Sequence, residues 1–159
     1  MDQVHVIVWL THPGDLLGEM ISFETHGVGQ HAGFRRGNGK IHELYMPQVR
    51  DRDERLGEAA IFEEYTIQGL TDELSLALEA QFDRNLAAYI KYDIWDLFRI
   101  ALCIPFPLNK SGVCSCYVDN TIRTILPPEL WILQRINSDE ISPRDIRMSM
   151  HLPLFIKNP

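Results

Sequence analysis

The sequence predicts an α+β fold in which an antiparallel sheet packs against helices. Strand-like segments occupy the first part of the chain, up to about residue 67, and helical periodicity dominates from residue 71 to about residue 126. Short strand-like segments return after that. Strands and helices that are segregated in this way favour α+β over alternating β-α-β units. With 159 residues and no internal repeat or linker, the chain (1–159) is predicted to form a single domain.

The strands are predicted from β-branched residues and alternating apolar positions. Residues 4–10 are apolar on both faces, which is typical of an interior strand. Residues 31–36 and 40–46 flank Gly37-Asn38-Gly39, and this predicts a hairpin because glycine and asparagine tolerate the positive φ of a tight turn. Elsewhere the sequence predicts a solvated, charge-dense loop over 50–58, and strands over 59–67, 131–136 and 152–156.

The helices are predicted from apolar spacing and from capping residues. Thr71 is a suitable N-cap for a helix whose apolar residues recur every three or four positions up to Tyr89. Further helices are predicted over 94–102 and over 114–126, each ending before proline residues. Ser142-Pro143-Arg144-Asp145 has the composition of a helix start.

Composition and charge exclude several classes of partner. Lys and Arg total 15 and Asp and Glu total 22, which gives a net charge of −7 and a pI near 5.3. An acidic chain is a poor candidate for binding nucleic acid or an anionic membrane. The longest apolar runs, 6–10 and 100–104, are far shorter than the ~20 residues of a membrane-spanning helix. Met1-Asp2-Gln3 does not begin a secretory signal peptide, so we expect synthesis in the cytoplasm.

The cysteines raise the question of a reactive thiol. There are three of them, Cys103, Cys114 and Cys116, so at least one thiol is expected to be free. Cys103 and Cys116 are expected in the core. Cys114 lies at a predicted helix start, where unpaired N–H groups and the helix dipole favour the thiolate, the form that attacks carbonyl carbon. The alternative is that Cys114 is a small buried apolar residue.

A nucleophilic cysteine needs a base, and His31 on the predicted hairpin is a candidate. If the hairpin loop is the three residues 37–39, His31 and Glu43 are diagonal neighbours on one face, within hydrogen-bonding reach. A carboxylate so placed would orient the imidazole and stabilise its charged form. If the loop is only Asn38-Gly39, Glu43 moves to the opposite face. On spacing alone, a surface glutamate beside a structural histidine is an equal alternative.

Five blocks of the sequence, in order, point to a known family. They are Pro13-Gly14-Asp15-Leu16, Gln30-His31-Ala32-Gly33-Phe34, Tyr92-Asp93-Ile94-Trp95-Asp96-Leu97-Phe98, Cys114-Ser115-Cys116-Tyr117-Val118 and Ser142-Pro143-Arg144-Asp145-Ile146. In these blocks the chain resembles the circularly permuted papain-like cysteine hydrolases, the permuted branch of the NlpC superfamily of amidases and endopeptidases. The resemblance extends from about residue 13 to residue 150. It implies a papain-like fold in which the histidine-bearing strands come first and the cysteine-bearing helix comes late.

The resemblance also implies roles for three residues. Cys114 would be the nucleophile, His31 the general base and then acid, and Glu43 the residue that orients the imidazole. The implied reaction is hydrolysis of an amide, with peptidoglycan peptides as the usual substrates of the family and acylated lipids in some branches. No metal or organic cofactor is expected. The sequence departs from the family where Cys116 and Tyr117 replace a Glu-Leu pair, and this departure bears on the substrate.

A second interpretation keeps the fold without turnover. A cell-wall hydrolase with no secretion signal must leave the cytoplasm by lysis, in a virion or through an injection system. The chain is therefore also a candidate for a catalytically silent binding or structural module, such as a component of a phage tail or an injected effector.

Overall fold

The computed structural model describes residues 3–11, 31–53, 61–95, 113–131, 146 and 155–157. Within them, six strands form one antiparallel sheet in the order β4-β3-β2-β1-β5-β6. The strands are β1 (His5–Thr11), β2 (His31–Arg35), β3 (Ile41–Tyr45), β4 (Gln48–Arg52), β5 (Ile61–Ile67) and β6 (Phe155–Lys157). The helices are α2 (Asp72–Ala87), α4 (Cys114–Ile125) and the short 3₁₀ helix η1 (Pro128–Leu130). An α+β fold with an antiparallel sheet, as the sequence predicts, is confirmed.

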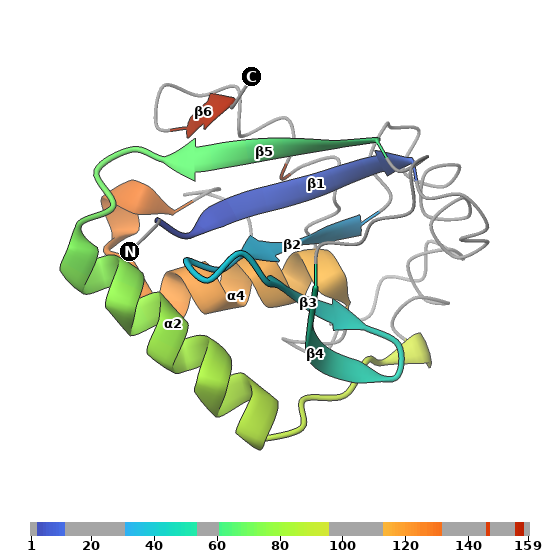
Figure 1. Ribbon diagram of the computed structural model, residues 1–159. Helices are drawn as coiled ribbons and strands as arrows, with labels where there is room; N and C mark the ends of the chain where they lie inside the picture. The colour runs from blue at the N-terminus through green and yellow to red at the C-terminus, as the bar shows by residue number, and fades with distance from the viewer. Residues whose placement is uncertain are drawn as a thin grey trace.

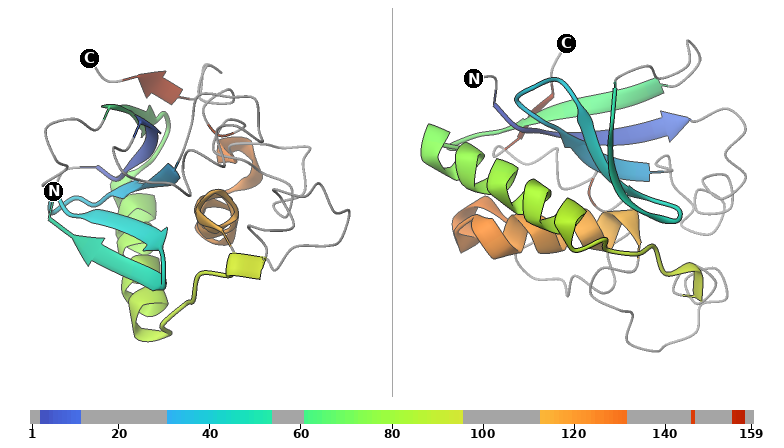
Figure 2. Two further views of the ribbon diagram at one scale, coloured as in Figure 1. Left: turned by 90° about the vertical axis from the view of Figure 1, so that its right-hand side faces the viewer. Right: turned by 60° about the horizontal axis from the view of Figure 1, so that its bottom comes forward.

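Both α2 and α4 lie on the same face of the sheet (Figure 1, Figure 2). Along β1, Val6 and Val8 point to this face and join the main core. Ile7 and Trp9 point to the opposite face, where they are equally buried. Because β1 lies between β2 and β5, its prediction as an interior strand is confirmed.

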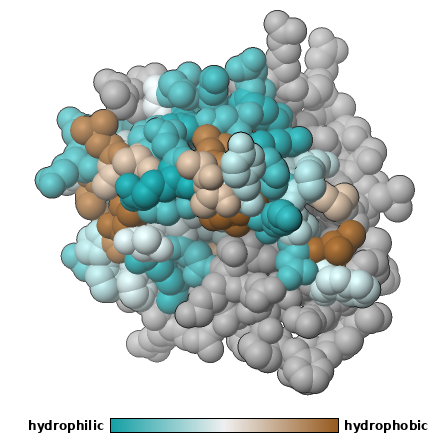
Figure 3. Space-filling view, turned by 90° about the horizontal axis from the view of Figure 1, so that it is seen from below, coloured by the Kyte–Doolittle hydropathy of each residue, from teal (hydrophilic) through white to brown (hydrophobic). Residues whose placement is uncertain are grey.

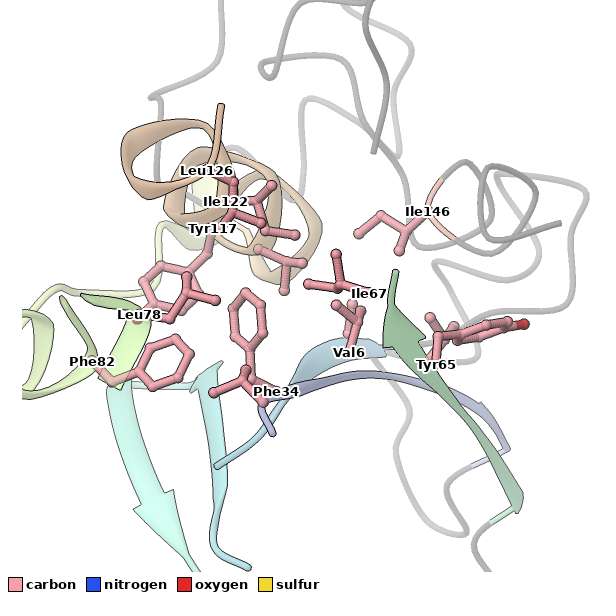
Figure 4. Close-up of a cluster of buried hydrophobic side chains, with 14 of the residues drawn as sticks. Val6, Phe34, Tyr65, Ile67, Leu78, Phe82, Tyr117, Ile122, Leu126 and Ile146 are labelled. Carbon is pink, nitrogen blue, oxygen red and sulfur yellow. The ribbon is translucent and has the colours of Figure 1, made fainter. Parts of the chain in front are cut away.

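The main hydrophobic core fills the space between the sheet and the two helices (Figure 4). It includes Val6, Phe34, Ile67, Leu78, Phe82, Tyr117 and Ile122, all almost completely buried. Removing such apolar surface from water stabilises the fold by roughly 25 cal/mol per Å². The same packing holds α4 against β2 and β3, and thereby fixes where the helix begins.

The hairpin between β2 and β3 adopts the first of the two registers that the sequence allows. Phe34 pairs with His42 and Arg35 pairs with Ile41. The Arg36 N–H donates to the Lys40 carbonyl at 2.8 Å, which closes a loop of three residues. This register places His31 and Glu43 on one face of the sheet.

The prediction of a solvated loop over 50–58 is wrong for residues 50–52. These residues belong to β4, which pairs with β3 so that Arg50 lies opposite Glu43. The charged side chains are accommodated because β4 is the edge strand of the described sheet, and because Arg50 and Arg52 have a buried carboxylate as partner.

The two long helices begin where the sequence predicts. The Thr71 hydroxyl accepts a hydrogen bond from the Leu74 N–H at 3.3 Å, so Thr71 is the N-cap of α2. That helix ends at Ala87 and not at Tyr89, which has a left-handed backbone with φ of 49°. α4 begins at Cys114.

Four further predicted segments lie partly or wholly outside the described residues. β6 over residues 155–157 agrees with the predicted last strand, but Trp131 follows η1 and is not in a strand. The rest of the 131–136 prediction, the 94–102 helix beyond residue 95, the start at 142–145 and Cys103 lie outside the described residues.

Neither long helix of the described residues has the length and apolar character needed to cross a bilayer. The described part of the surface seen from below is mostly hydrophilic, and its hydrophobic residues form small, separate patches (Figure 3).

Candidate active site

The three residues that the sequence singles out come together in the structure. His31 is the first residue of β2, Glu43 lies in the middle of β3, and Cys114 is the first residue of α4. The His31 Nε2 atom lies 3.1 Å from the Glu43 Oε2 atom, and the Cys114 side chain lies near enough to the His31 ring to raise its pKa. All three side chains are buried. The imidazole therefore lies between a carboxylate and a thiol.

The environment of His31 favours its charged form. Burial by itself lowers the pKa of His31, but the negative charges of Cys114 and Glu43, and hydrogen bonds to both, raise the pKa of His31 from 6.5 to about 10. Because Glu43 engages Nε2, the ring nitrogen left to face the thiol is Nδ1. The arrangement therefore favours an imidazolium beside Cys114.

Glu43 is a carboxylate with no exposed surface and three partners of opposite charge. Its Oε1 atom accepts hydrogen bonds from Arg50 Nε at 2.9 Å and from Arg52 Nε at 2.7 Å. Burial raises the pKa of Glu43, but hydrogen bonds and charge from His31 and Arg52 outweigh this and hold it well below the usual range. Glu43 is thus ionised at neutral pH and can hold the imidazolium in one orientation.

Aromatic rings restrict His31 on two further sides. The Trp9 ring lies 5.0 Å from the imidazole, centroid to centroid, and the Tyr45 ring lies 5.5 Å away in an edge-on arrangement. Arg52 lies over the Trp9 ring and Arg50 over the Tyr45 ring, with the cation 5.7 and 4.2 Å from the respective centroids. The two arginines therefore hold both the carboxylate and the rings that surround the imidazole.

Cys114 lies at the electropositive end of α4. Its N-cap, Val113, has an extended backbone and contributes no side-chain hydrogen bond to the helix end. A helix N-terminus of this kind favours a nearby negative charge. Cys116 lies on the same helix, but it is fully buried and carries none of the site contacts described above.

Sequence reasoning missed Arg50, Arg52, Trp9 and Tyr45 as parts of this site. One feature predicts the two arginines in retrospect: residues 48–52 alternate so that Arg50 and Arg52 share a face. After a two-residue turn at Met46-Pro47, that face is the one that carries Glu43. The aromatic residues have no comparable sequence pattern, because their role depends on how β1 and β3 pair with β2.

The described residues contain no group of three or more histidine, cysteine, aspartate or glutamate side chains placed to hold a metal ion. In the candidate site, the His31 Nε2 atom and the Glu43 carboxylate are directed at each other and at the arginines. These residues therefore do not fit a metal site.

Comparisons with known proteins add a fold relationship. No family model matches the chain, and no curated protein matches it. Among solved structures, the chain is similar to the metalloprotein yiiX from Escherichia coli O157:H7, a DUF1105 protein. The two share 15% sequence identity with a TM-score of 0.62, over 99% of this chain and 96% of that chain. At this identity the similarity shows the fold alone.

Proposed function

We propose that this chain is a cysteine hydrolase of the circularly permuted papain-like type, with Cys114 as nucleophile, His31 as general base and acid, and Glu43 as the orienting carboxylate. One observation carries the proposal: the His31 imidazole bridges the Glu43 carboxylate and the Cys114 sulfur. The histidine strand precedes the cysteine helix in the chain, in the order that the resemblance implies.

The proposed reaction begins with the Cys114 thiolate, which forms a bond to the carbonyl carbon of an amide. The carbonyl oxygen becomes an oxyanion, and the Cys114 backbone N–H at the start of α4 is a donor to it. Collapse of this intermediate breaks the C–N bond, and His31 gives its proton to the departing amine. The product of this half-reaction is a thioester on Cys114.

Water completes the cycle. The neutral His31 imidazole takes a proton from a water molecule, whose oxygen attacks the thioester carbonyl. The C–S bond breaks, the carboxylic acid leaves, and the thiolate and imidazolium are restored. Glu43 remains ionised throughout and keeps the ring in place.

The substrate class follows from the resemblance. We expect peptide amides to be the main substrates, with peptidoglycan peptides as the leading class, and acyl amides to be the next class. A role in a virion or in an injected effector would bring such an enzyme to the cell wall.

No step in this proposal passes through a metal. The structural neighbour is described as a metalloprotein, but the donor groups of the candidate site are directed at one another, and the described residues offer no other cluster of ligands.

One observation favours the second candidate function, a catalytically silent module of the same fold. Cys114 is 1% exposed and His31 is 6% exposed, so a substrate carbonyl reaches the sulfur only if the site opens. An enzyme must allow that opening, whereas a binding or structural module need not.

Alkylation separates the two functions. Iodoacetamide at about pH 6 should label Cys114 much faster than Cys103 or Cys116, because thiolate is the reactive form. Mass spectrometry of the digested protein identifies the labelled residue, and Cys114→Ala should remove the fast phase while Cys116→Ala leaves it intact. Equal, slow labelling of all three cysteines would favour the silent module. Hydrolysis of peptidoglycan peptides by the wild type, absent in Cys114→Ala, would then establish the activity.

A further inference from the structure

A second set of buried polar residues lies on the other face of β3 from Glu43. His42 is adjacent to Glu43 in the chain, so its side chain points toward the helices. Its Nε2 atom lies 2.6 Å from the Tyr117 hydroxyl of α4, and its Nδ1 atom lies 2.6 Å from Asp51 Oδ1 of β4. The Tyr117 hydroxyl also accepts a hydrogen bond from Asn85 Nδ2 of α2 at 2.7 Å.

The hydrogen bonds of this set are mutually consistent. Asp51 is a carboxylate and can only accept, so His42 Nδ1 carries a hydrogen and donates it. The His42 Nε2 atom and the Tyr117 hydroxyl share a second hydrogen bond, which the hydroxyl can either donate or accept. The charge of His42 and Arg36, and hydrogen bonds from both, outweigh burial and hold the pKa of Asp51 below its usual range.

Arg36 links the same carboxylate, Asp51, to α2. Its guanidinium donates to Asp51 of β4 at 2.6 Å, and to Glu79 and Asp83 of α2 at 2.6 and 2.8 Å. We call Asn85, Tyr117, His42, Asp51 and Arg36 the Tyr117 network. It joins both helices to β3 and β4 through directional contacts that are buried or partly buried, and such contacts tolerate displacement less than apolar packing does.

Tyr117 is three residues after Cys114, so the two side chains lie on neighbouring turns of the same helical face. A contact that fixes Tyr117 therefore also fixes the rotation and the axial position of the first turn of α4. The partner of Tyr117 is His42, and the neighbour of His42 in the chain is the Glu43 that holds His31. Strand β3 therefore contacts both parts of the candidate site: His42 binds Tyr117 on the cysteine-bearing helix, and Glu43 binds His31.

We propose that Tyr117 is a positioning residue, which holds the first turn of α4 through His42 and Asn85 so that the Cys114 sulfur stays against the His31 ring. This inference rests on the proposed function and deepens it. Apolar packing of α4 against β2 brings the helix near the sheet, but it allows several similar rotations of the helix about its axis. The hydrogen bonds of the Tyr117 hydroxyl favour one of these rotations.

Tyr117→Phe tests the proposal because it keeps the aromatic ring and removes only the hydroxyl. Two properties are measured without any substrate: the pH profile of Cys114 alkylation and the NMR titration of His31. We expect Tyr117→Phe to slow the alkylation of Cys114 at about pH 6 roughly tenfold, and to lower the pKa of His31.

Ile122→Val is the matched control. Ile122 is fully buried on the same helix and has no part in the Tyr117 network, so losing one methyl group lowers stability without releasing the helix. Its alkylation profile and His31 titration should match the wild type. An effect of equal size in Ile122→Val would show that Tyr117 acts through stability alone and would overturn the proposal.

A wild-type profile in folded Tyr117→Phe would likewise overturn the inference. If that variant does not fold, Asn85→Leu, which removes the Asn85 bond to the hydroxyl, should shift both readouts in the same direction by a smaller amount, and no shift there is equally decisive. The proposed function fails separately, by absent hydrolysis in the wild type, because neither readout requires turnover.

Discussion

Gly33 and Glu43 lie opposite each other in the hairpin, so close that a side chain at residue 33 would have to push its neighbours aside. A Cβ atom at position 33 would lie 3.2 Å from the Glu43 Cβ atom, 3.3 Å from the Trp9 ring and 3.0 Å from the His42 carbonyl oxygen. Contacts this short are tighter than nearly all real contacts of a Cβ atom. The absence of a side chain at residue 33 therefore lets the carboxylate and the indole approach His31.

Gly33→Ala should disturb the site as well as the fold. The added methyl group must displace Trp9 or Glu43, and such overpacking costs about 1–3 kcal/mol. We expect a lower free energy of unfolding in urea, and slower alkylation of Cys114 at about pH 6, because His31 loses its fixed partner.

Gly39→Ala is the control for that experiment. Gly39 has a φ of 81°, so alanine there is strained, at about 1 kcal/mol, but an added Cβ would meet nothing within 4 Å. It should lower stability and leave the alkylation rate unchanged. If both variants slow alkylation equally, Gly33 has no special relation to the site.

Glu43→Gln should change how stability depends on acid. The pKa of Glu43 is lowered below its unfolded value of 4.5, so the stabilisation is present above about pH 4.5 and is lost as the pH falls below that value. Without the charge, the free energy of unfolding should fall less steeply with acid, and at neutral pH it should be lower by about 1–3 kcal/mol. Urea denaturation between about pH 2 and pH 7 measures both effects. An unchanged acid dependence would contradict the ionised state of Glu43.

Cys114→Ala should lower the pKa of His31. The negative charge of Cys114 is one of the causes that raise this pKa to about 10, and alanine cannot replace it. NMR titration of the His31 ring should show a decrease of about one pH unit or more. Cys116→Ala is the matched control and should leave the pKa of His31 unchanged. A histidine that titrates identically in all three proteins would place the thiol too far from the ring to act with it.

Arg36→Lys should destabilise the fold although lysine keeps the positive charge. The planar guanidinium binds Asp51, Glu79 and Asp83 at once, and a single ammonium group cannot reproduce that geometry. We expect a loss of about 1–3 kcal/mol in urea denaturation. Arg84→Lys, at an exposed position that bonds only Gln81 among the described residues, should stay within about 0.5 kcal/mol of the wild type.

Local chemistry allowed much of the fold to be predicted from the sequence. The turn Gly37-Asn38-Gly39 limited the hairpin to two registers, and Thr71 marked the start of α2. Both features depend on residues a few positions apart. The structure then selected the register that unites His31 and Glu43.

The rest of the site depends on contacts between distant elements. The sequence predicts a loop at residues 50–52 because the arginines there suggest solvent when their partner, Glu43, is unknown. In the sequence, Tyr117 stands out only as a departure from the pattern of the family that the chain resembles. Its hydrogen bond to His42 joins residues that are 75 positions apart, and no local pattern encodes such a pairing.

The bond between His31 Nε2 and Glu43 has a consequence for how a catalytic cycle would run. Glu43 engages one ring nitrogen, and the Trp9 and Tyr45 rings flank the imidazole on two sides. Every proton would then have to enter and leave through a single atom, Nδ1, first from the thiol, then to the amine, then from water. The amine must consequently depart before water can be activated, so the architecture itself would impose the order of the two half-reactions.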